Sequence, residues 1–296
     1  MGRLPENIRF RRRPIHMQGG IVRNGIWRLP GADLTVTGGG GPSFPNEPGG
    51  YTVRYHHQFG VLPADDNGIA GTDWYIESLG SPALAIEADA TAPSGNGYIM
   101  RTTFPYGMGD GGAPSHVNVG YISDFQRVSE QYISLRVKLE NADWENQQVG
   151  SKLFYIGHGG SDGEANNESF FMFRNETEVL EAQNPLSFGI WQQGGIDDRY
   201  EGPNIGASAQ FYCGVWNQIE LRMVLSDIDT YNGTLEIWIN GNKTHDFSDI
   251  IWRTTAKPLG FKTFKWDPVW GGDSGNVKTR DDFMLLDEVY VSGIPI

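Results

Sequence analysis

The chain has 296 residues, of which 39% are hydrophobic and 40 are glycine, and its net charge is −13. This length suits one large all-β domain or two small domains, and the glycine content argues against a helical bundle. The sequence contains no apolar run long enough for a membrane-spanning helix, and its first residues contain no apolar core of a secretory signal. The acidic balance argues against a body that binds nucleic acid.

The beginning of the chain differs in charge from the rest. Residues 1–28 contain seven arginines and a single acid, Glu6, so this segment has a charge of +6 and the remaining residues together have −19. The densest basic group consists of Arg9, Arg11, Arg12 and Arg13. A basic arm on an acidic body predicts docking on an acidic neighbour, such as another copy of the chain. A solvated tail without a partner is the alternative.

Residues 1–50 are interpreted as an irregular arm. Several prolines and the run Gly38–Gly41 interrupt any regular ladder in this region. A short hairpin is expected at Ile21–Trp27, with Asn24-Gly25 as its turn. The compact domain is then expected to cover residues 51–296, without a further boundary.

After Tyr51, short runs alternate between apolar and polar residues, and Gly, Asn or Asp separates them. Alternation with a period of two is typical of a strand with one buried face, and many short strands predict a sandwich. The strands expected first are Tyr51–Tyr55, Tyr98–Thr102, Ile133–Leu139, Lys152–Ile156, Ser169–Arg174 and Ser187–Trp191. No long amphipathic helix is expected, although a single helical turn fits residues 64–70 or 176–182.

The clearest element is a hairpin that begins near Trp216. Ile219–Met223 alternates, a loop rich in Asp and Asn follows, and Leu235–Ile239 alternates again before Asn240-Gly241. Asn and Gly tolerate the positive φ angles of tight turns, so these runs predict antiparallel strands. The last expected strand is Phe283–Val291.

Five segments in the second half of the chain together resemble a known fold. They are Gly150–Gly160, Phe173–Arg174, Trp216–Gly241, Phe264–Asp273 and Leu286–Ser292. Their order is similar to that in concanavalin A-like β-jelly rolls, and within this superfamily to the alginate and glucuronan lyases. The resemblance implies an all-β jelly-roll sandwich that follows the N-terminal arm.

The resemblance to lyases also implies candidate catalytic residues. β-Elimination on a uronic acid needs a cation beside the carboxylate, a base for the C5 proton and an acid for the leaving oxygen. Lys152, Tyr155 and His158 are the candidates on one strand, Arg174 is the candidate cation on the next, and His56-His57 offers another base. Strand parity puts Lys152 and His158 on one face and Tyr155 on the other, unless a bulge intervenes.

Three features argue against catalysis. Where the lyases carry a Tyr-x-Tyr pair, this chain has Phe188–Gln192, which contains no phenol. The acidic body repels polyuronates unless the site is locally basic. The acids of Glu140–Glu145 also lack the Glu-x-Asp-x-x-Glu spacing of jelly-roll glucanases.

Binding roles are predicted for other residues. Trp191, Trp266 and Trp270 are candidates for stacking on sugar rings, because Trp266 and Trp270 lie in a segment rich in Gly, Asp and Pro that is expected to be a loop. Related jelly rolls hold a structural Ca²⁺ through an aspartate of the last strand, which implies Asp287 here. The single cysteine, Cys213, excludes an internal disulfide and is expected to be buried.

Two functions follow from these observations. The first is a non-catalytic structural or assembly protein, such as a decoration or tail-associated component of a phage virion, with glycan binding. The alternative is a polysaccharide lyase that cleaves a uronic-acid polymer. The expected partners are protein neighbours, reached through the arm, and polysaccharide, with no membrane. The expected location is a virion or the extracellular space, without a conventional signal peptide.

Overall fold

A computed structural model gives the fold. It describes residues 22–23, 26–27, 44–59, 74–76, 84–114, 117–119, 126–145, 150–158, 168–174, 186–192, 210–271 and 275–296. The chain divides into two units, Met1–Gly41 and Pro42–Ile296. In the first unit, β1 (Val22–Arg23) pairs with β2 (Ile26–Trp27) in antiparallel fashion, as expected for a hairpin there.

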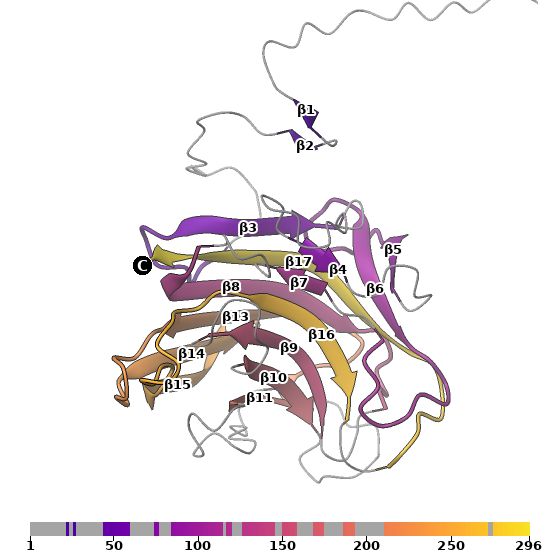
Figure 1. Cartoon of the computed structure of the whole chain (residues 1–296). Helices are drawn as coiled ribbons and strands as arrows, with labels where there is room; N and C mark the ends of the chain where they lie inside the picture. Colours follow the sequence, from indigo (N-terminus) through magenta and orange to yellow (C-terminus); the bar gives the residue numbers. More distant parts are fainter. Residues whose placement is uncertain are drawn as a thin grey trace, which may run out of the picture. The chain divides into compact units, whose positions relative to one another are not determined.

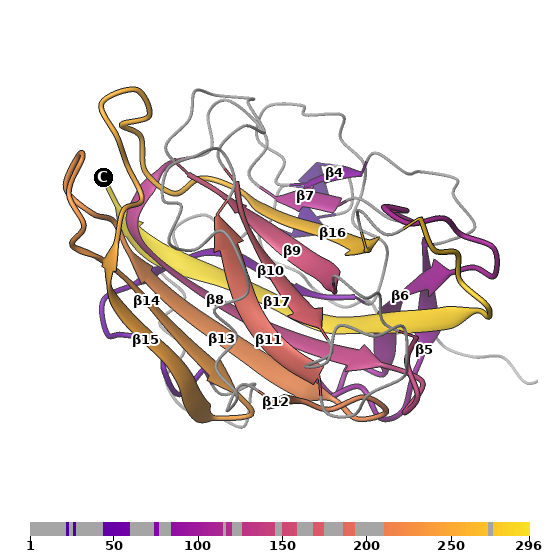
Figure 2. The same ribbon diagram turned by 90° about the horizontal axis from the view of Figure 1, so that it is seen from below.

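The second unit is an antiparallel β-sandwich whose two sheets form the layers seen in Figures 1 and 2. One sheet has the order β12-β11-β10-β9-β16-β7-β4 and is called the seven-stranded sheet. Its strands are β4 (Trp74–Ile76), β7 (Val117–Val119), β9 (Ser151–Gly157), β10 (Glu168–Arg174), β11 (Leu186–Gln192), β12 (Gln210–Phe211) and β16 (Phe264–Trp270).

The other sheet has the order β15-β14-β13-β8-β17-β6-β5, and β3 also pairs with β17; it is called the eight-stranded sheet. Its strands are β3 (Thr52–Gln58), β5 (Leu84–Ala88), β6 (Tyr98–Phe104), β8 (Val128–Leu139), β13 (Asn217–Val224), β14 (Gly233–Ile239), β15 (Asn242–Ile250) and β17 (Asp282–Pro295). In Figure 2, β9, β10, β11 and β16 lie in front of this sheet. The all-β jelly-roll sandwich is thereby confirmed.

The hairpin predicted after Trp216 is confirmed as β13 and β14. Ile219 pairs with Ile239, and Leu221 pairs with Ile237. Asn240 and Gly241 adopt φ angles of 52° and 79° in the turn between β14 and β15. These positive angles explain why Asn-Gly stands at this turn.

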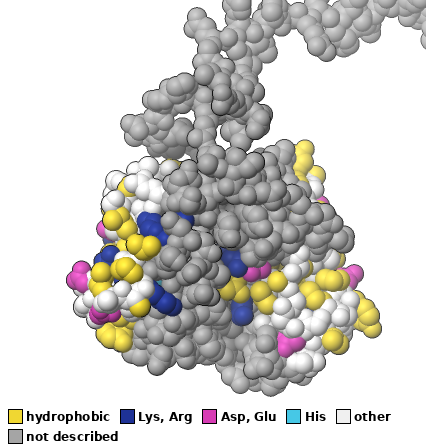
Figure 3. All heavy atoms as spheres, viewed as in Figure 1, with side chains coloured by type: hydrophobic (Ala, Val, Ile, Leu, Met, Phe, Trp, Pro, Cys, Tyr) yellow, Lys and Arg dark blue, Asp and Glu magenta, His cyan; other side chains and the backbone are white. Residues whose placement is uncertain are grey.

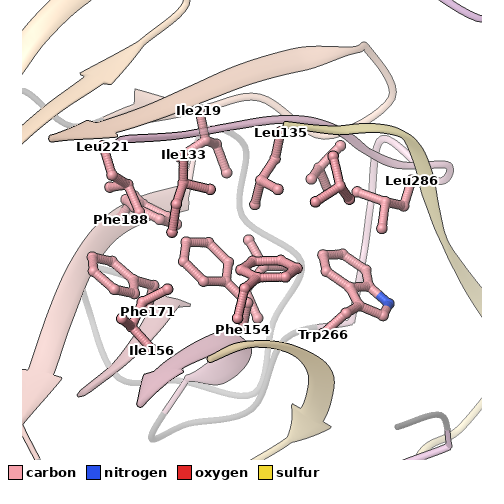
Figure 4. Close-up of a cluster of buried hydrophobic side chains, with 14 of the residues drawn as sticks. Ile133, Leu135, Phe154, Ile156, Phe171, Phe188, Ile219, Leu221, Trp266 and Leu286 are labelled. Carbon is pink, nitrogen blue, oxygen red and sulfur yellow. The ribbon is translucent and has the colours of Figure 1, made fainter. Parts of the chain in front are cut away.

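The core lies between the two sheets. Phe154, Phe171 and Trp266 of the seven-stranded sheet point toward Leu135 and Leu286 of the eight-stranded sheet (Figure 4). All five of these side chains are fully buried. Alternation along the strands supplies the core, because each strand contributes every second residue to it.

The segment Phe44–Tyr51 packs against the outer face of the eight-stranded sheet. The Phe44 ring stacks on Tyr290 with 3.8 Å between centroids, and the Asn46 amide donates to Glu220 at 3.0 Å. Glu220 is fully buried, although the alternation of its strand predicted a solvent-facing position. A polar position in a strand can be buried when another segment covers its face.

One expectation about the fold is wrong. Residues 264–270, expected to be a loop, form strand β16 in the middle of the seven-stranded sheet. The expected helical turns at 64–70 and 176–182 lie outside the described residues. None of the described residues forms a helix that is long and apolar enough to cross a membrane.

Candidate active site

A β-bulge in β9 decides which side chains share the outer face of the seven-stranded sheet, the face away from the core. Phe171 of β10 pairs with Phe154, but its neighbour Met172 pairs with Lys152, so Leu153 is an extra residue. Since Phe154 belongs to the core, Tyr155 lies on the outer face. The extra residue changes the parity, and Lys152 therefore shares the outer face with Tyr155.

Strand β16 adds two charged residues beside Tyr155. Lys265 pairs directly with Tyr155, and its ammonium lies 5.1 Å from the centroid of the Tyr155 ring. The same ammonium forms an ion pair with Asp267 at 3.3 Å. The register of β16 is irregular between Trp266 and Val269, where Pro268 has no N–H to donate to a ladder. Lys265 and Asp267 thus flank the bulged region from the neighbouring strand.

Lys152 lies at the other end of this group, paired with Val269. Its partial burial lowers the pKa of its ammonium below the ordinary value, and the negative charges of Asp267 and Asp110 oppose that shift. Lys152, Tyr155, Lys265 and Asp267 are hereafter called the lysine–tyrosine site. Charged side chains of both signs are interspersed with hydrophobic ones on the described surface in Figure 3.

Tyr155 and Lys265 lie within a row of paired positions that crosses six strands. From β11 to β4 the row runs through positions 191, 170, 155, 265, 118 and 75. Directly paired residues in a sheet are neighbours on one face. Of this row, the structure describes the side-chain placement of Tyr155 and Lys265 only. Position 191, predicted to contact glycan, belongs to the same row, and its contact with glycan stays a prediction.

The structure separates His158 from the other predicted catalytic residues. Its side chain is buried, and Nδ1 donates a hydrogen bond to the Trp252 carbonyl at 3.0 Å. The ring meets the Trp252 ring edge to face, with 5.1 Å between centroids. Burial lowers the pKa of His158 to about 4. Strand parity alone puts Lys152 and His158 on one face, but the bulge that the prediction left open is present at Leu153 and reverses the parity.

Two of the predicted glycan-contacting tryptophans belong to the core instead. Trp266 and Trp270 are completely buried, and Trp266 points into the space between the sheets (Figure 4). Trp270 donates from its indole nitrogen to the Glu145 carbonyl at 2.7 Å. Their segment is a strand, so its alternation turns both rings inward, and the prediction that these two rings stack on sugar is wrong.

Asp287 has a different environment from that expected of a calcium ligand. Its carboxylate accepts hydrogen bonds from the backbone nitrogen and the hydroxyl of Ser94, at 2.5 Å and 2.7 Å. Burial raises the pKa of Asp287. Among the described residues, no group of three or more His, Cys, Asp or Glu side chains could hold a metal ion. Calcium binding at Asp287 therefore stays a prediction.

For the remaining candidates the structure gives less information. Arg174 is the last residue of β10 and pairs with Ser187, and its side-chain position lies outside the described part. The arm residues Arg9, Arg11, Arg12 and Arg13 lie outside the described residues altogether. Cys213 is buried as expected, and burial raises the pKa of its thiol to about 12.

Two members of the lysine–tyrosine site, Lys265 and Asp267, were not predicted from the sequence. The signal for them was present, since Phe264-Lys265-Trp266-Asp267 alternates between apolar and polar residues. The Gly and Pro residues that follow favoured a loop instead. Had the alternation been given more weight, Lys265 and Asp267 would have been placed on the outer face of a strand.

The site combines groups suited to an acidic sugar. Two ammonium groups can bind a carboxylate and stabilise the charge that develops when its α-carbon loses a proton. A phenol can exchange a proton with a substrate within hydrogen-bond reach. Tyr155 is 6% exposed. The side chains of Lys265 and Asp267 are 14% and 10% exposed, so the interaction between their charges is only weakly screened.

The fold defines a class: a concanavalin A-like β-jelly roll of the kind found in polysaccharide lyases. Within it, residues 196–286 match the family model of polysaccharide lyase 14. The matched span is less than half of the chain; it includes Lys265 and Asp267 and leaves out Lys152 and Tyr155. No curated protein matches the sequence at a significant level.

Solved structures share the fold at low sequence identity. A marine PL-14 alginate lyase from Aplysia kurodai is 12% identical with a TM-score of 0.56, over 81% of this chain and 98% of that one. An endo-β-1,4-glucuronan lyase from the fungus Trichoderma reesei is 16% identical with a TM-score of 0.50, over 82% and 96%. The alginate lyase Aly36B is 17% identical with a TM-score of 0.51, over 67% and 82%.

Proposed function

We propose that the chain binds a uronic-acid polysaccharide at the lysine–tyrosine site and cleaves it by β-elimination. The observation that carries the proposal is the bulge at Leu153, which brings Lys152 and Tyr155 to one face beside Lys265. Without the bulge, the cation and the phenol of this strand would lie on opposite faces. The partial match to polysaccharide lyase 14 and the fold shared with alginate and glucuronan lyases support the same reading.

Each residue has a part in the proposed reaction. Lys152 and Lys265 bind the uronate carboxylate and stabilise the negative charge that forms when C5 is deprotonated. Tyr155 takes the C5 proton as the phenolate and gives a proton to the leaving oxygen as the phenol, because its ring lies beside the Lys265 ammonium and shares a face with Lys152. The electron pair of the C5–H bond becomes the C4–C5 double bond, the C4–O bond breaks, and the leaving oxygen takes up a proton.

The test is to mix the protein with alginate, glucuronan and other uronate polymers and follow the ultraviolet absorbance of the unsaturated product. We expect absorbance to rise with at least one polymer and to rise much more slowly with Tyr155→Phe. Tyr98→Phe is the matched control, since Tyr98 is an exposed tyrosine at the start of β6 in the other sheet. A flat trace over the whole panel, with the protein folded, would rule out the lyase.

The low exposure of Tyr155 favours a second candidate function, in which the same face does not catalyse. In this alternative the jelly roll is an assembly component, for example of a virion, and its basic arm docks on an acidic neighbour. Native mass measurement tests it: a defined oligomer that is lost on removal of residues 1–28, with the domain still folded, is the expected result. A monomer at all concentrations would contradict it.

A further inference from the structure

The lysine–tyrosine site contains its own carboxylate, and the proposed function gives that carboxylate no role. Asp267 forms an ion pair with Lys265 at 3.3 Å and also acts electrostatically on Lys152, as does Asp110. Two ammonium groups are therefore accompanied by two carboxylates in the described part of the site. A site built for a dense polyanion would gain from the opposite arrangement, with cations in excess.

The position of Asp267 is set by the backbone. It lies in the irregular stretch of β16, between the residues that pair with Phe154 and Lys152, and Pro268 follows it. The Lys265 side chain is 14% exposed and that of Asp267 is 10% exposed. Because both are largely shielded from solvent, salt weakens their interaction less than it weakens a surface ion pair. Asp267 thus offsets lysine charge where a substrate carboxylate would bind.

We propose that Asp267 sets the specificity of the site for a polysaccharide whose uronic acids are separated by neutral sugars, and against one with a carboxylate on every sugar. The inference deepens the proposed function and rests on it. With Asp267 present, the lysines can accept one substrate carboxylate, and a second carboxylate on the adjacent sugar meets Asp267 and is repelled. The net charge of −13 acts in the same direction, although salt screens it beyond about 8 Å.

The experiment compares two polymers and two single substitutions that remove the same charge. Binding is measured by calorimetry with a homopolymer of glucuronic acid and with hyaluronan, in which glucuronic acid alternates with a neutral sugar. Asp267→Asn removes the proposed selectivity residue. Asp246→Asn is the matched control, because Asp246 pairs with Lys243 in the other sheet and has a 63% exposed side chain.

For the wild type we expect tighter binding of the alternating polymer. Asp267→Asn should raise affinity for the homopolymer by about tenfold and change affinity for the alternating polymer much less. Asp246→Asn should leave the ratio unchanged. Asp110→Asn, which removes the second carboxylate acting on Lys152, provides a further variant in case Asp267→Asn does not fold, and it should shift the ratio in the same direction by a smaller factor.

The failures can be told apart. If the wild type binds a uronate polymer and neither Asp267→Asn nor Asp110→Asn changes the ratio, the specificity inference is wrong and the proposed function stands. An equal change with Asp246→Asn would also overturn the inference, because the effect would then come from overall charge. If the folded wild type binds neither polymer but acts on another uronate polymer of the panel, the inference is wrong and the proposed function stands. If it also gives a flat absorbance trace over the whole panel, the proposed function fails and the inference fails with it.

Discussion

Charged side chains have different surroundings on the outer faces of the two sheets. On the eight-stranded sheet, buried carboxylates have several polar partners. Glu288, for example, forms hydrogen bonds with His56 at 2.8 Å and Gln58 at 3.2 Å, and it forms an ion pair with Arg136 at 3.5 Å. On the seven-stranded sheet, Lys265 lies beside Tyr155, and a bulge brings Lys152 to the same face. The carboxylate on the first face has polar partners from β3 and β8, whereas on the second face the charged pair Lys265 and Asp267 lies beside a phenol.

We infer that the outer face of the eight-stranded sheet contributes to stability and that the outer face of the seven-stranded sheet contributes to binding. Buried charges are costly unless they are paired and hydrogen-bonded, so a covered face with several partners per carboxylate stabilises the sandwich. A bulge disrupts the ladder locally and redirects side chains, which is a common device beside functional sites. Substitutions on the eight-stranded face should therefore change the free energy of unfolding, and those at the lysine–tyrosine site should change function.

The largest expected effect on function is at Lys152. Lys152→Ala removes the cation that shares its face with Tyr155, so cleavage or binding of the polymer that the wild type accepts should fall by about 100-fold. The free energy of unfolding should change little, because burial disfavours the charged form of this lysine. Initial rates and calorimetric affinities measure the first effect, and urea unfolding measures the second.

The control for that comparison is Lys243→Ala. Lys243 bridges Glu236 and Asp246 on the other sheet, with a 38% exposed side chain. Lys243→Ala removes one positive charge from the chain, as Lys152→Ala does. An equal loss of function in both variants would therefore mean that net charge matters and the lysine–tyrosine site does not. A loss of folding in Lys152→Ala would contradict the separation of the two faces.

The second prediction uses His158, which is buried beside Trp252 and Phe261, to distinguish acid unfolding from titration of the lysine–tyrosine site. Burial lowers its pKa from 6.5 to about 4, so the unfolded chain binds more protons than the folded one between these values. The contribution of the buried, neutral His158 to the free energy of unfolding is therefore fully present above about pH 6.5, and it is lost as the pH falls toward about 4. The loss from this residue should be about 3 kcal/mol at about pH 4.

The measurement compares urea unfolding of the wild type and His158→Gln from about pH 7 to about pH 4. Glutamine does not titrate, and its amide can still donate to the Trp252 carbonyl that His158 contacts. The difference in unfolding free energy between the two proteins should shift by about 3 kcal/mol in favour of the variant as the pH falls. Parallel curves would show that His158 is not buried as a neutral side chain.

The sequence predicted the fold better than the site, and the reason is physical. Alternation and Asn-Gly turns are local, so β13, β14 and β17 could be placed from their own residues. The bulge in β9 depends on how β10 and β16 pair with it, and a change of parity has no local signal. For that reason strand parity puts Lys152 on the face of His158 and opposite Tyr155, and the sequence leaves the presence of a bulge open.

The sequence also contained no sign that side chains on the outer face of a sheet are buried. Glu220 alternates as a solvent-facing residue should, but Phe44–Tyr51, distant in sequence, covers it. The tryptophans of β16 show the converse case, in which residues assigned to a loop supply the core. Contacts between distant segments decide both cases, and one sequence does not display them.

The smallest effect is expected from Tyr132→Phe on the covered face. The Tyr132 hydroxyl donates to the buried Glu220 carboxylate, and both side chains are fully buried. Removing the hydroxyl takes one of the described partners from a buried carboxylate, and the Asn46 amide remains at 3.0 Å. The free energy of unfolding should fall by about 2 kcal/mol, while polymer binding stays at the wild-type level.

Denaturant unfolding and calorimetry on the same samples check both parts of this prediction. Tyr98→Phe, which alters an exposed tyrosine of the same sheet, is the matched control and should leave stability nearly unchanged. If Tyr132→Phe weakens polymer binding as strongly as it weakens the fold, the two outer faces are coupled through the core. The division between a stabilising face and a binding face would then have to be abandoned.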